Sequence, residues 1–404
     1  MSKRTVTPEE LAHPLIPYEE AVEKILSFFG PLEPREVAVR AALGLVASEP
    51  LVADTDVPGF ENSAMDGYAV IAADTHADLP VVLRLVDDLP AGTAPTRTVT
   101  TGTAAKIMTG APIPPGADAV VPWENTEAHE DAVAVLVSTA AGKHVRPRGE
   151  DVKAGTEIFG AGTRLRAVHL GVLASLGRTQ VRVHPRPRIA ILSTGDELVE
   201  PGGILRPGQI FESNRAHLRG VCEENGADVI AEAMIGDEPD AIAKWLSEIA
   251  PSVDLIVTTG GASVGEHDWI RLVLEREGGL HMWRAAIKPG KPVAFGRIGN
   301  TSVLGLPGNP GSAFVTAHIF LARALRVMGG LPREPRSVRA RLGEAVKGTP
   351  NRTLFTRVTL DGETATPLPR QSSVVLSNLI PADGFAIVPP GGLEAGAEVT
   401  VEMI

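Results

Sequence analysis

The chain has 404 residues, of which 44% are hydrophobic and 22% charged, as in an ordinary soluble globular protein. This length is large for a single hydrophobic core, and the usual domain size predicts about three domains. The 38 Lys and Arg residues against 49 Asp and Glu give a formal net charge of −11, which argues against a general nucleic-acid binder. Affinity for anions therefore has to come from local basic groups.

Cysteine usage and hydropathy indicate the compartment. Cys222 is the only cysteine, so no disulfide can form within the chain, which suits a reducing compartment. The N-terminal segment lacks the apolar core of a signal peptide, and no apolar stretch approaches the roughly 20 residues of a membrane helix. We expect a cytoplasmic protein with no membrane partner.

The N-terminal part of the chain mixes helix and strand patterns. Residues 17–29 have the apolar spacing of an amphipathic helix, and residues 35–43 predict a second helix. From about residue 51 to 137 the pattern changes to short strands separated by Gly and Pro turns. Residues 144–165 continue this β pattern, and residues 167–176 predict a further helix.

After the proline-rich segment 184–188, strand and helix patterns alternate. The strand patterns lie at 189–192, 229–231, 253–257, 292–295 and 302–306, and the helix patterns at 214–225, 241–249, 270–276 and 312–328. Ser213 is the expected N-cap of the first of these helices. Such alternation predicts a mostly parallel sheet with helices on both faces, whose ligands bind at the carboxyl ends of the strands. Beyond residue 330 only strand patterns follow, which predicts a small β-barrel or sandwich.

The loop at residues 258–269, Thr-Thr-Gly-Gly-Ala-Ser-Val-Gly-Glu-His-Asp-Trp, joins a buried strand to a helix. A glycine-rich turn that enters a helix brings bare backbone N–H groups and the positive end of the helix dipole together, which favours phosphate. Glu266 and Asp268 would repel phosphate unless a cation lay between them, so the loop indicates an anion together with a divalent metal. A tight strand-to-helix turn without a ligand is the alternative. His267 is interpreted as a solvent-facing residue.

Three more loops fall at the same end of the predicted sheet. Residues 193–198 (Ser-Thr-Gly-Asp-Glu-Leu) offer hard oxygen ligands for Mg²⁺, or form a solvated acidic turn. Residues 287–292 (Ile-Lys-Pro-Gly-Lys-Pro) carry two lysines that suit an oxyanion clamp, or simply face solvent. Residues 306–312 (Leu-Pro-Gly-Asn-Pro-Gly-Ser) let backbone approach a ligand closely, and also suit a rigid connection into a helix. Asp237, between a strand and a helix, is by itself interpreted as a cap.

Two motifs lie before the α/β segment, at residues 62–69 and 106–118, and the residues alone indicate only constrained loops. No zinc-ligand spacing, Walker A lysine or Gly-x-Ser-x-Gly elbow occurs in the chain.

Taken in chain order, these loops resemble the molybdopterin molybdenumtransferase family, known as MoeA in bacteria and as the C-terminal domain of gephyrin in animals. The motifs that carry the resemblance are Ser-Ala-Met-Asp-Gly-Tyr-Ala at 63–69, Met-Thr-Gly-Ala-Pro at 108–112, Ser-Thr-Gly-Asp-Glu-Leu at 193–198, Gly-Gly-Ala-Ser-Val-Gly-Glu at 260–266, Ile-Lys-Pro-Gly-Lys-Pro at 287–292 and Leu-Pro-Gly-Asn-Pro-Gly-Ser at 306–312. The resemblance spans essentially the whole chain.

The resemblance implies a multidomain α/β and β fold. Its centre would be a MogA-like three-layer α/β molybdopterin-binding domain with a mostly parallel sheet. A split N-terminal α+β dimerisation domain, a β-rich insertion domain and a small C-terminal β-barrel would surround it. The implied boundaries are 1–54 with 144–184 for the split domain, 55–143 for the insertion, 185–330 for the α/β domain and 331–404 for the barrel.

The resemblance also implies a reaction, the Mg²⁺-dependent insertion of molybdate into adenylylated molybdopterin with release of AMP and molybdenum cofactor. The implied catalytic residues are Asp66, Thr109, Glu197, Asp237, Asp268 and Lys288, with Mg²⁺ held by Glu197, Asp237 and Asp268. The implied substrate-binding residues are Gly260, Gly261, Ser263, Gly265, Lys291, Pro307, Gly308, Pro310 and Ser312. Such clamping by a metal and cations suits chemistry that joins charged groups and breaks a phosphoanhydride.

The implied assembly is a homodimer in which Asp66 and Thr109 complete the site of the partner subunit, with a MogA-like adenylyltransferase as a further partner and no nucleic acid. Arg284 stands where relatives often have lysine, and we interpret it as an anion contact. Three other functions stay open: adenylylation of molybdopterin itself, a scaffold that binds a peptide as gephyrin does, and a catalytically idle pterin-binding chaperone.

Overall fold

The computed structural model describes residues 15–260, 269–277 and 279–404. The chain divides into two compact units. The main unit comprises residues 1–48, 162–166 and 181–404, and the insertion unit comprises residues 49–161 and 167–180. Within the described ranges, no helix is long and apolar enough to cross a membrane.

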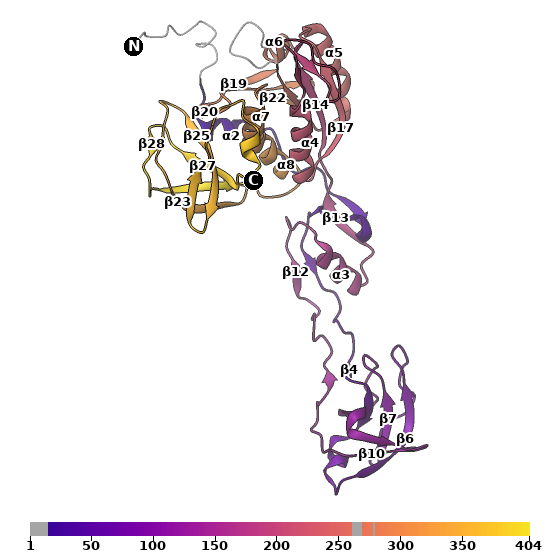
Figure 1. Cartoon of the computed structure of the whole chain (residues 1–404). Helices are drawn as coiled ribbons and strands as arrows, with labels where there is room; N and C mark the ends of the chain where they lie inside the picture. The colour runs from indigo at the N-terminus through magenta and orange to yellow at the C-terminus, as the bar shows by residue number, and fades with distance from the viewer. Residues whose placement is uncertain (1–14, 261–268, 278) are drawn as a thin grey trace. The chain divides into compact units, whose positions relative to one another are not determined.

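A six-stranded sheet forms the centre of the main unit (Figure 1). Its strand order is β17 (Asp228–Ile235), β14 (Arg188–Thr194), β18 (Leu255–Thr259), β22 (Thr301–Leu306), β21 (Pro292–Ile298) and β19 (Leu280–Arg284). The first four strands are parallel, and the last two add to the edge in antiparallel pairing. The mostly parallel sheet predicted from the alternating pattern is therefore confirmed.

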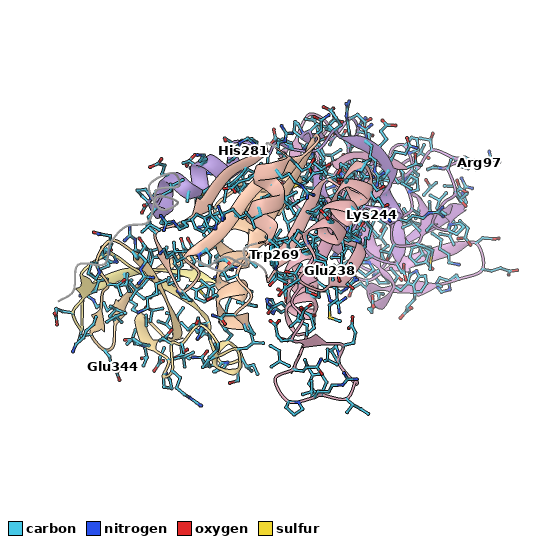
Figure 2. The ribbon with its side chains drawn as sticks, turned by 90° about the horizontal axis from the view of Figure 1, so that it is seen from above. Arg97, Glu238, Lys244, Trp269, His281 and Glu344 are labelled. Carbon is cyan, nitrogen blue, oxygen red and sulfur yellow. The ribbon has the colours of Figure 1, made fainter. Side chains whose placement is uncertain are left out.

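Helices cover both faces of this sheet because successive side chains of a strand point to opposite sides. Ile189 and Ile191 pack into one core with α4 (Asn214–Glu224), α8 (Ala322–Met328) and the N-terminal α2 (Tyr18–Leu26). Ala190 and Leu192 pack into a second core with α5 (Pro239–Ile249) and α6 (Trp269–Arg276). Lys244 lies on the exposed side of α5 (Figure 2). The result is the three-layer α/β architecture.

Two helix predictions are corrected by the structure. The predicted helix at 35–43 is wrong: strand β1 (Arg35–Ala38) and one 3₁₀ turn (Val39–Ala41) occupy it. β1 pairs with β13 (Gln180–His184), so pairing between distant segments overrides the local apolar spacing. The predicted helix at 312–328 is interrupted, because a π turn (Ala317–Leu321) separates α7 (Pro310–Thr316) from α8.

The C-terminal segment forms a closed five-stranded barrel (Figure 1). Its strands are β23 (Ser337–Leu342), β25 (Thr353–Asp361), β26 (Thr364–Pro367), β27 (Gly384–Val388) and β29 (Glu398–Met403). Pairing of β25 with β27 closes the barrel, so the barrel alternative is correct and the sandwich alternative is wrong. The short strand β20 (Ile287–Lys288) joins the α/β domain to the barrel through parallel pairing with β25, with Lys288 opposite Leu354.

A buried polar network also fixes the barrel against the helices. Arg323 of α8, 1% exposed, donates from Nη2 to Oε1 of the buried Glu402 in β29 and, over 3.2 Å, to the hydroxyl of Tyr18 in α2. Nη1 of Arg323 donates to the carbonyl of Ile319 at 2.9 Å. Burial and the neighbouring Glu402 raise the pKa of Tyr18. The charged pair thus joins three separate segments within one interior.

The insertion unit contains a six-stranded sheet ordered β8-β5-β7-β6-β10-β9. The strands are β5 (Gly67–Val70), β6 (Val81–Leu89), β7 (Thr103–Ile107), β8 (Ala119–Pro122), β9 (Thr126–Ala128) and β10 (Ala132–Val135). The helix predicted at 167–176 is present as α3 (Ala167–Ser175). Together the two units give the multidomain α/β and β fold, while the boundaries of four domains stay a prediction.

Candidate functional site

The main unit holds a cavity of about 900 Å³ where the carboxyl-end loops of the sheet meet the barrel. Eight residues predicted for the site line this cavity: Glu197, Gly260, Lys288, Lys291, Pro307, Gly308, Pro310 and Ser312. We call their side the α/β wall. The structure therefore brings together loops that follow strands β14, β18 and β22 and the lysine loop around β20.

Bare backbone forms much of the α/β wall. Gly260 ends β18 with φ +83, and a Cβ there would lie 2.1 Å from the carbonyl oxygen of Thr194. A Cβ on Gly308 would lie 3.3 Å from the Cα of Gly260. The two loops are therefore packed backbone against backbone. Because neither glycine carries a side chain, a ligand in the cavity can approach their main chain closely.

The lysine loop has a fixed path. Gly290 has φ +101, and a Cβ on it would meet Cγ2 of Thr316 at 2.3 Å, so only glycine fits between α7 and the loop. Lys288 and Lys291 flank this tight contact, and both line the cavity. Two ammonium groups on a rigid loop create a local positive potential in a chain of net charge −11.

The sequence reasoning missed the opposite side of the cavity, the barrel wall, which is lined by Arg352, Gln371, Ser372, Ser373 and Val374. Gln371 is fully engaged: Oε1 accepts the N–H of Arg357 at 3.0 Å, and Nε2 donates to the carbonyls of Arg357 and Leu368 at 2.8 Å each. The carbonyl of Ser373 accepts the N–H of Ser312 at 3.1 Å, which joins the two walls. The sequence signal that could have indicated this wall is the polar run Arg-Gln-Ser-Ser at residues 370–373, which lies between two strands.

Arg357 adds a buried positive charge behind the barrel wall. It is 1% exposed, and its Nη1 donates to the carbonyl of Ser372 at 3.3 Å. Its Nε and Nη2 atoms have no hydrogen-bond partner among the described residues, and no carboxylate there forms an ion pair with it. Burial lowers the pKa of its guanidinium. An uncompensated charge of this kind favours an anion in the adjacent cavity.

The predicted carboxylates separate into two groups. Glu197 lines the cavity, whereas Asp237 lies at the end of the adjoining strand β17 outside the lining, and its N–H donates to Oδ1 of Asp196 at 3.0 Å. Capping by the side chain of Asp237 stays a prediction. Within the described ranges, no cluster of three His, Cys, Asp or Glu side chains is arranged for a metal ion.

Four predicted residues, Gly261, Ser263, Gly265 and Asp268, lie outside the described residues, as do Glu266 and His267. Trp269 begins α6 directly after them, and its partly buried side chain packs against the second core.

Asp66 and Thr109 lie in the insertion unit and are bonded to each other. Oδ1 of Asp66 accepts both the backbone N–H and the hydroxyl of Thr109, each at 2.7 Å. These two hydrogen bonds lower the pKa of the Asp66 carboxyl, so the group is ionised at neutral pH.

Arg284, interpreted from the sequence as an anion contact, is 4% exposed. Its guanidinium carbon lies 5.1 Å from the centroid of the Trp283 ring, and it is absent from the cavity lining.

The N-terminal capping of α4 also differs from the expectation. The side chain of Ser213 makes no capping hydrogen bond; instead Oε1 of Glu212 accepts the N–H groups of Asn214 at 2.8 Å and Arg215 at 3.0 Å. A longer side chain one residue earlier satisfies the same orphan donors.

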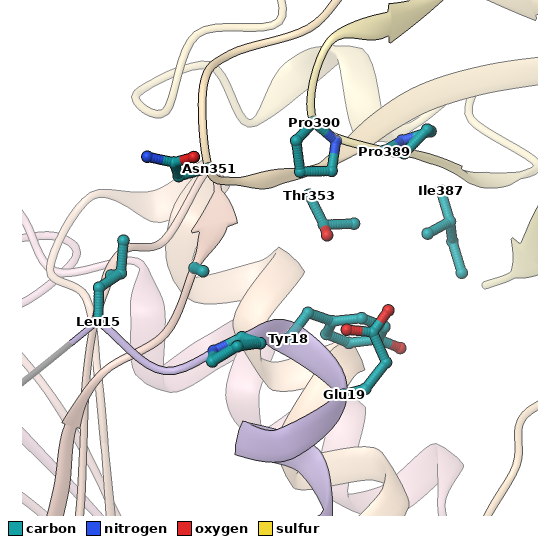
Figure 3. Close-up of a pocket in the computed structure, with 10 residues that line it drawn as sticks. Leu15, Tyr18, Glu19, Asn351, Thr353, Ile387, Pro389 and Pro390 are labelled. Carbon is teal, nitrogen blue, oxygen red and sulfur yellow. The ribbon is translucent and has the colours of Figure 1, made fainter.

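A second cavity of about 550 Å³ lies between the start of α2 and the barrel (Figure 3). Its lining is Leu15, Pro17, Tyr18, Glu19, Ala286, Asn351, Thr353, Ile387, Pro389 and Pro390. It has apolar walls and an acidic side chain, Glu19, and the described residues that line it include no lysine or arginine. Of these two cavities, the 900 Å³ cavity is therefore the one suited to anionic ligands.

Three family profiles match successive parts of the chain. They are described as the MoeA N-terminal region (domain I and II), over residues 16–177, the probable molybdopterin binding domain, over 190–327, and the MoeA C-terminal region (domain IV), over 339–404. The chain is similar to molybdopterin molybdenumtransferase 2 of Mycobacterium tuberculosis, with 38% identity over 92% of this chain and 94% of the relative. It is also similar to molybdopterin molybdenumtransferase of Bacillus subtilis, with 32% identity over 96% and 94%.

Solved structures agree with these matches. Two structures of a molybdopterin biosynthesis MoeA protein from Pyrococcus horikoshii align with TM-scores of 0.82 and 0.77, at 32% and 30% sequence identity. Each alignment covers 96% of this chain, and 99% and 100% of the respective Pyrococcus chain. The relatives that match nearly the whole chain, the three family profiles and the solved structures all agree. The chain therefore belongs to the MoeA family.

Proposed function

We propose that this protein inserts molybdate into adenylylated molybdopterin in a Mg²⁺-dependent reaction that releases AMP and forms the molybdenum cofactor. The observation that carries the proposal is the 900 Å³ cavity, whose lining combines Lys288, Lys291 and Arg352 with the bare backbone of Gly260 and Gly308. Such a site suits several anionic groups at once. Relatives that match nearly the whole chain are named molybdopterin molybdenumtransferases, which supports the same reading.

The cations address the main electrostatic difficulty of the reaction. Molybdate is a dianion, and the phosphoanhydride of the adenylylated substrate also carries negative charge, so the reactants repel each other. Lys288, Lys291 and Arg352 would reduce this repulsion and hold the two groups in a productive orientation. As the phosphoanhydride breaks, negative charge grows on the departing AMP, and the same cations would stabilise it.

Carboxylates lie at the ends of β14 and β17, and Mg²⁺ commonly takes one or two carboxylates together with substrate phosphates and water. Glu197 and Asp237, together with Asp268, would hold the ion in this proposal. When bound, Mg²⁺ would neutralise phosphate charge. Glu197 is positioned by its own loop, since its carbonyl accepts the N–H of Ile210, another cavity residue, at 2.9 Å.

We further propose that the protein acts as a homodimer, with Asp66 and Thr109 of one subunit completing the site of the other. The ionised carboxylate of Asp66 is held rigidly by Thr109, which suits a positioning role toward a substrate donor group. Mixing Asp66→Ala with Glu197→Ala subunits tests this. Recovery of part of the activity in the mixture supports a shared site, and no recovery counts against it.

In the proposed setting, a MogA-like adenylyltransferase supplies the substrate in the cytoplasm.

Cys222 is fully buried in the main core, and burial raises the pKa of its thiol to about 12, so it is inert toward the dithiolene of the substrate.

The deciding experiment supplies purified protein with adenylylated molybdopterin, molybdate and Mg²⁺. We expect AMP release well above a protein-free control and dependent on molybdate. No release above the control would end the transferase proposal. An enzyme that adenylylates molybdopterin would instead consume ATP and release pyrophosphate, so assaying both products separates the two activities. Lys244→Met, on the exposed side of α5, is the matched control for lysine variants of the cavity.

A further inference from the structure

Two loops of the α/β wall have to keep a fixed spacing if their backbone is to hold the substrate. One ends β18 at Gly260, and the other is the turn at Pro307 and Gly308 after β22. Thr259 connects the two loops directly, since its hydroxyl donates to the carbonyl of Pro307 at 3.1 Å. A third element also bonds to both loops and holds their spacing.

That element is Asn214, the first residue of α4, which is 8% exposed. Its Nδ2 donates to Oγ1 of Thr259 and to the carbonyl of Gly308, each at 2.8 Å. One amide group thus binds both loops, at the residue before Gly260 in one and at Gly308 itself in the other. Thr259, 1% exposed, passes the connection on to Pro307, so three hydrogen bonds form a single buried network.

The position of Asn214 is itself fixed by charged neighbours. The buried Glu212 caps α4, because its Oε1 accepts the backbone N–H of Asn214 at 2.8 Å. Glu212 also forms an ion pair with Arg215 at 3.2 Å, and Arg215 binds Glu200 beyond the Glu197 loop. The helix terminus is therefore anchored to the carboxylate side of the cavity as well.

Oδ1 of Asn214 is buried and accepts no hydrogen bond from the described residues. A buried acceptor without a partner is costly, and its retention indicates that the donating side of the amide is what the fold uses here.

We propose that Asn214 is a positioning residue, which sets the distance between the Gly260 and Gly308 backbone and thereby the affinity for the anionic end of the substrate. This inference rests on the proposed function for the identity of the substrate. Asn214 acts through Thr259 and Gly308 and needs no contact with the reacting atoms. It should therefore affect substrate affinity more than the rate of the chemical step.

The test compares Asn214→Ala with Asn225→Ala. Asn225 is at the other end of the same helix, and its Nδ2 donates within that helix to the carbonyl of Val221 at 2.8 Å. We expect Asn214→Ala to raise KM for adenylylated molybdopterin about tenfold with kcat changed less than twofold, and Asn225→Ala to leave both unchanged. Equal effects of the two variants on KM, or a fall in kcat alone, would overturn the proposal.

Thr259→Val keeps the shape of the residue and removes its hydroxyl, so it provides a milder variant if Asn214→Ala folds poorly. We expect a KM increase of about threefold from Thr259→Val, and a double variant no worse than Asn214→Ala alone, since both act through one network. Fully additive effects would contradict it.

Calorimetric titration with AMP and with molybdate, in the absence of turnover, separates this inference from the proposed function. Weaker AMP binding by Asn214→Ala supports positioning even if the wild-type protein releases no AMP. Unchanged binding of both ligands overturns it even if the transferase assay succeeds.

Discussion

The α/β side of the cavity is lined by glycine and proline loops, Glu197 and two lysines, whereas the barrel side is lined mainly by the polar side chains of Arg352, Gln371, Ser372 and Ser373. The α/β wall is built from loops at strand ends. Glycine occupies these loops at Gly260 and Gly308 because the neighbouring backbone leaves little room for a Cβ. The barrel wall is built around Gln371 and the buried Arg357, and its charge lies partly behind the surface. The α/β wall therefore offers groups that can contact a ligand directly, and the barrel wall adds positive electrostatic potential from the buried Arg357.

The largest expected effect comes from single variants that each remove one cation, Lys288 from the α/β wall or Arg352 from the barrel wall. Lys288→Met should lower kcat/KM for molybdate insertion about 100- to 1000-fold, because Lys288 is assigned to the reacting groups whereas the remaining Lys291 is assigned to substrate binding. Arg352→Met should cost about tenfold, since Arg357 still supplies charge behind that wall. Steady-state assays of both variants measure the difference. A larger loss from Arg352→Met would reverse the assignment of the walls.

The tight packing of the lysine loop predicts a large loss of stability from Gly290→Ala. Its φ of +101 and the 2.3 Å approach to Cγ2 of Thr316 should reduce the free energy of unfolding by about 2–4 kcal/mol. Gly299→Ala, at φ +58 with nothing within 4 Å, should cost only about 1 kcal/mol. Urea unfolding measures both. Thr316→Ser, which keeps the hydroxyl that bonds Ser312, should restore part of the loss; no restoration would mean that φ strain alone is responsible.

The contact between the π turn (Ala317–Leu321) and the barrel predicts a pH-dependence of stability. His318, in the π turn, packs against Phe385 of the barrel, and burial with the charge of Arg323 lowers its pKa from 6.5 to about 4. Its contribution to stability is present above pH 6.5 and is lost as the pH falls toward 4, because the unfolded chain then binds the proton more readily. The loss is about 3 kcal/mol at most.

Urea unfolding between pH 4 and 7 tests this contribution, and His318→Gln should flatten the profile. The exposed His129→Gln is the control. His217, whose pKa burial also lowers to about 4, should leave a residual slope. Wild-type stability that does not fall with pH would mean that Glu402, with Oε2 at 3.7 Å from Nε2, keeps His318 protonated.

The smallest expected effect concerns Arg357. Arg357→Leu should weaken molybdate binding about threefold, while the melting temperature stays equal or rises, because an unpaired buried guanidinium is costly to fold. Titration calorimetry and thermal unfolding measure the two quantities. Strongly reduced stability with unchanged binding would show that the residue serves the barrel alone.

Much of the α/β wall was predictable from the sequence because its loops at Glu197, Gly260 and Gly308 follow apolar strands. The barrel wall was missed because Arg352 and Ser373 reach the cavity through contacts between distant segments, which no local pattern reveals. These contacts are the pairing of β20 with β25 and the hydrogen bond from the N–H of Ser312 to the carbonyl of Ser373. The same physics explains why residues 35–43 were wrongly predicted as helix: β1 exists because β13, far along the chain, pairs with it. The cap of α4 was misplaced by one residue because Glu212 is a longer acceptor than Ser213.

The short pairing of β20 with β25 has a consequence for engineering. Two residue pairs, Ile287 with Thr353 and Lys288 with Leu354, set where the lysine loop stands against the strand that follows Arg352. A chimera that takes its barrel from a relative would keep this spacing only if the donor strand presents the same register at both pairs. Grafts of the barrel should therefore begin before residue 351 and be screened for register before they are screened for turnover.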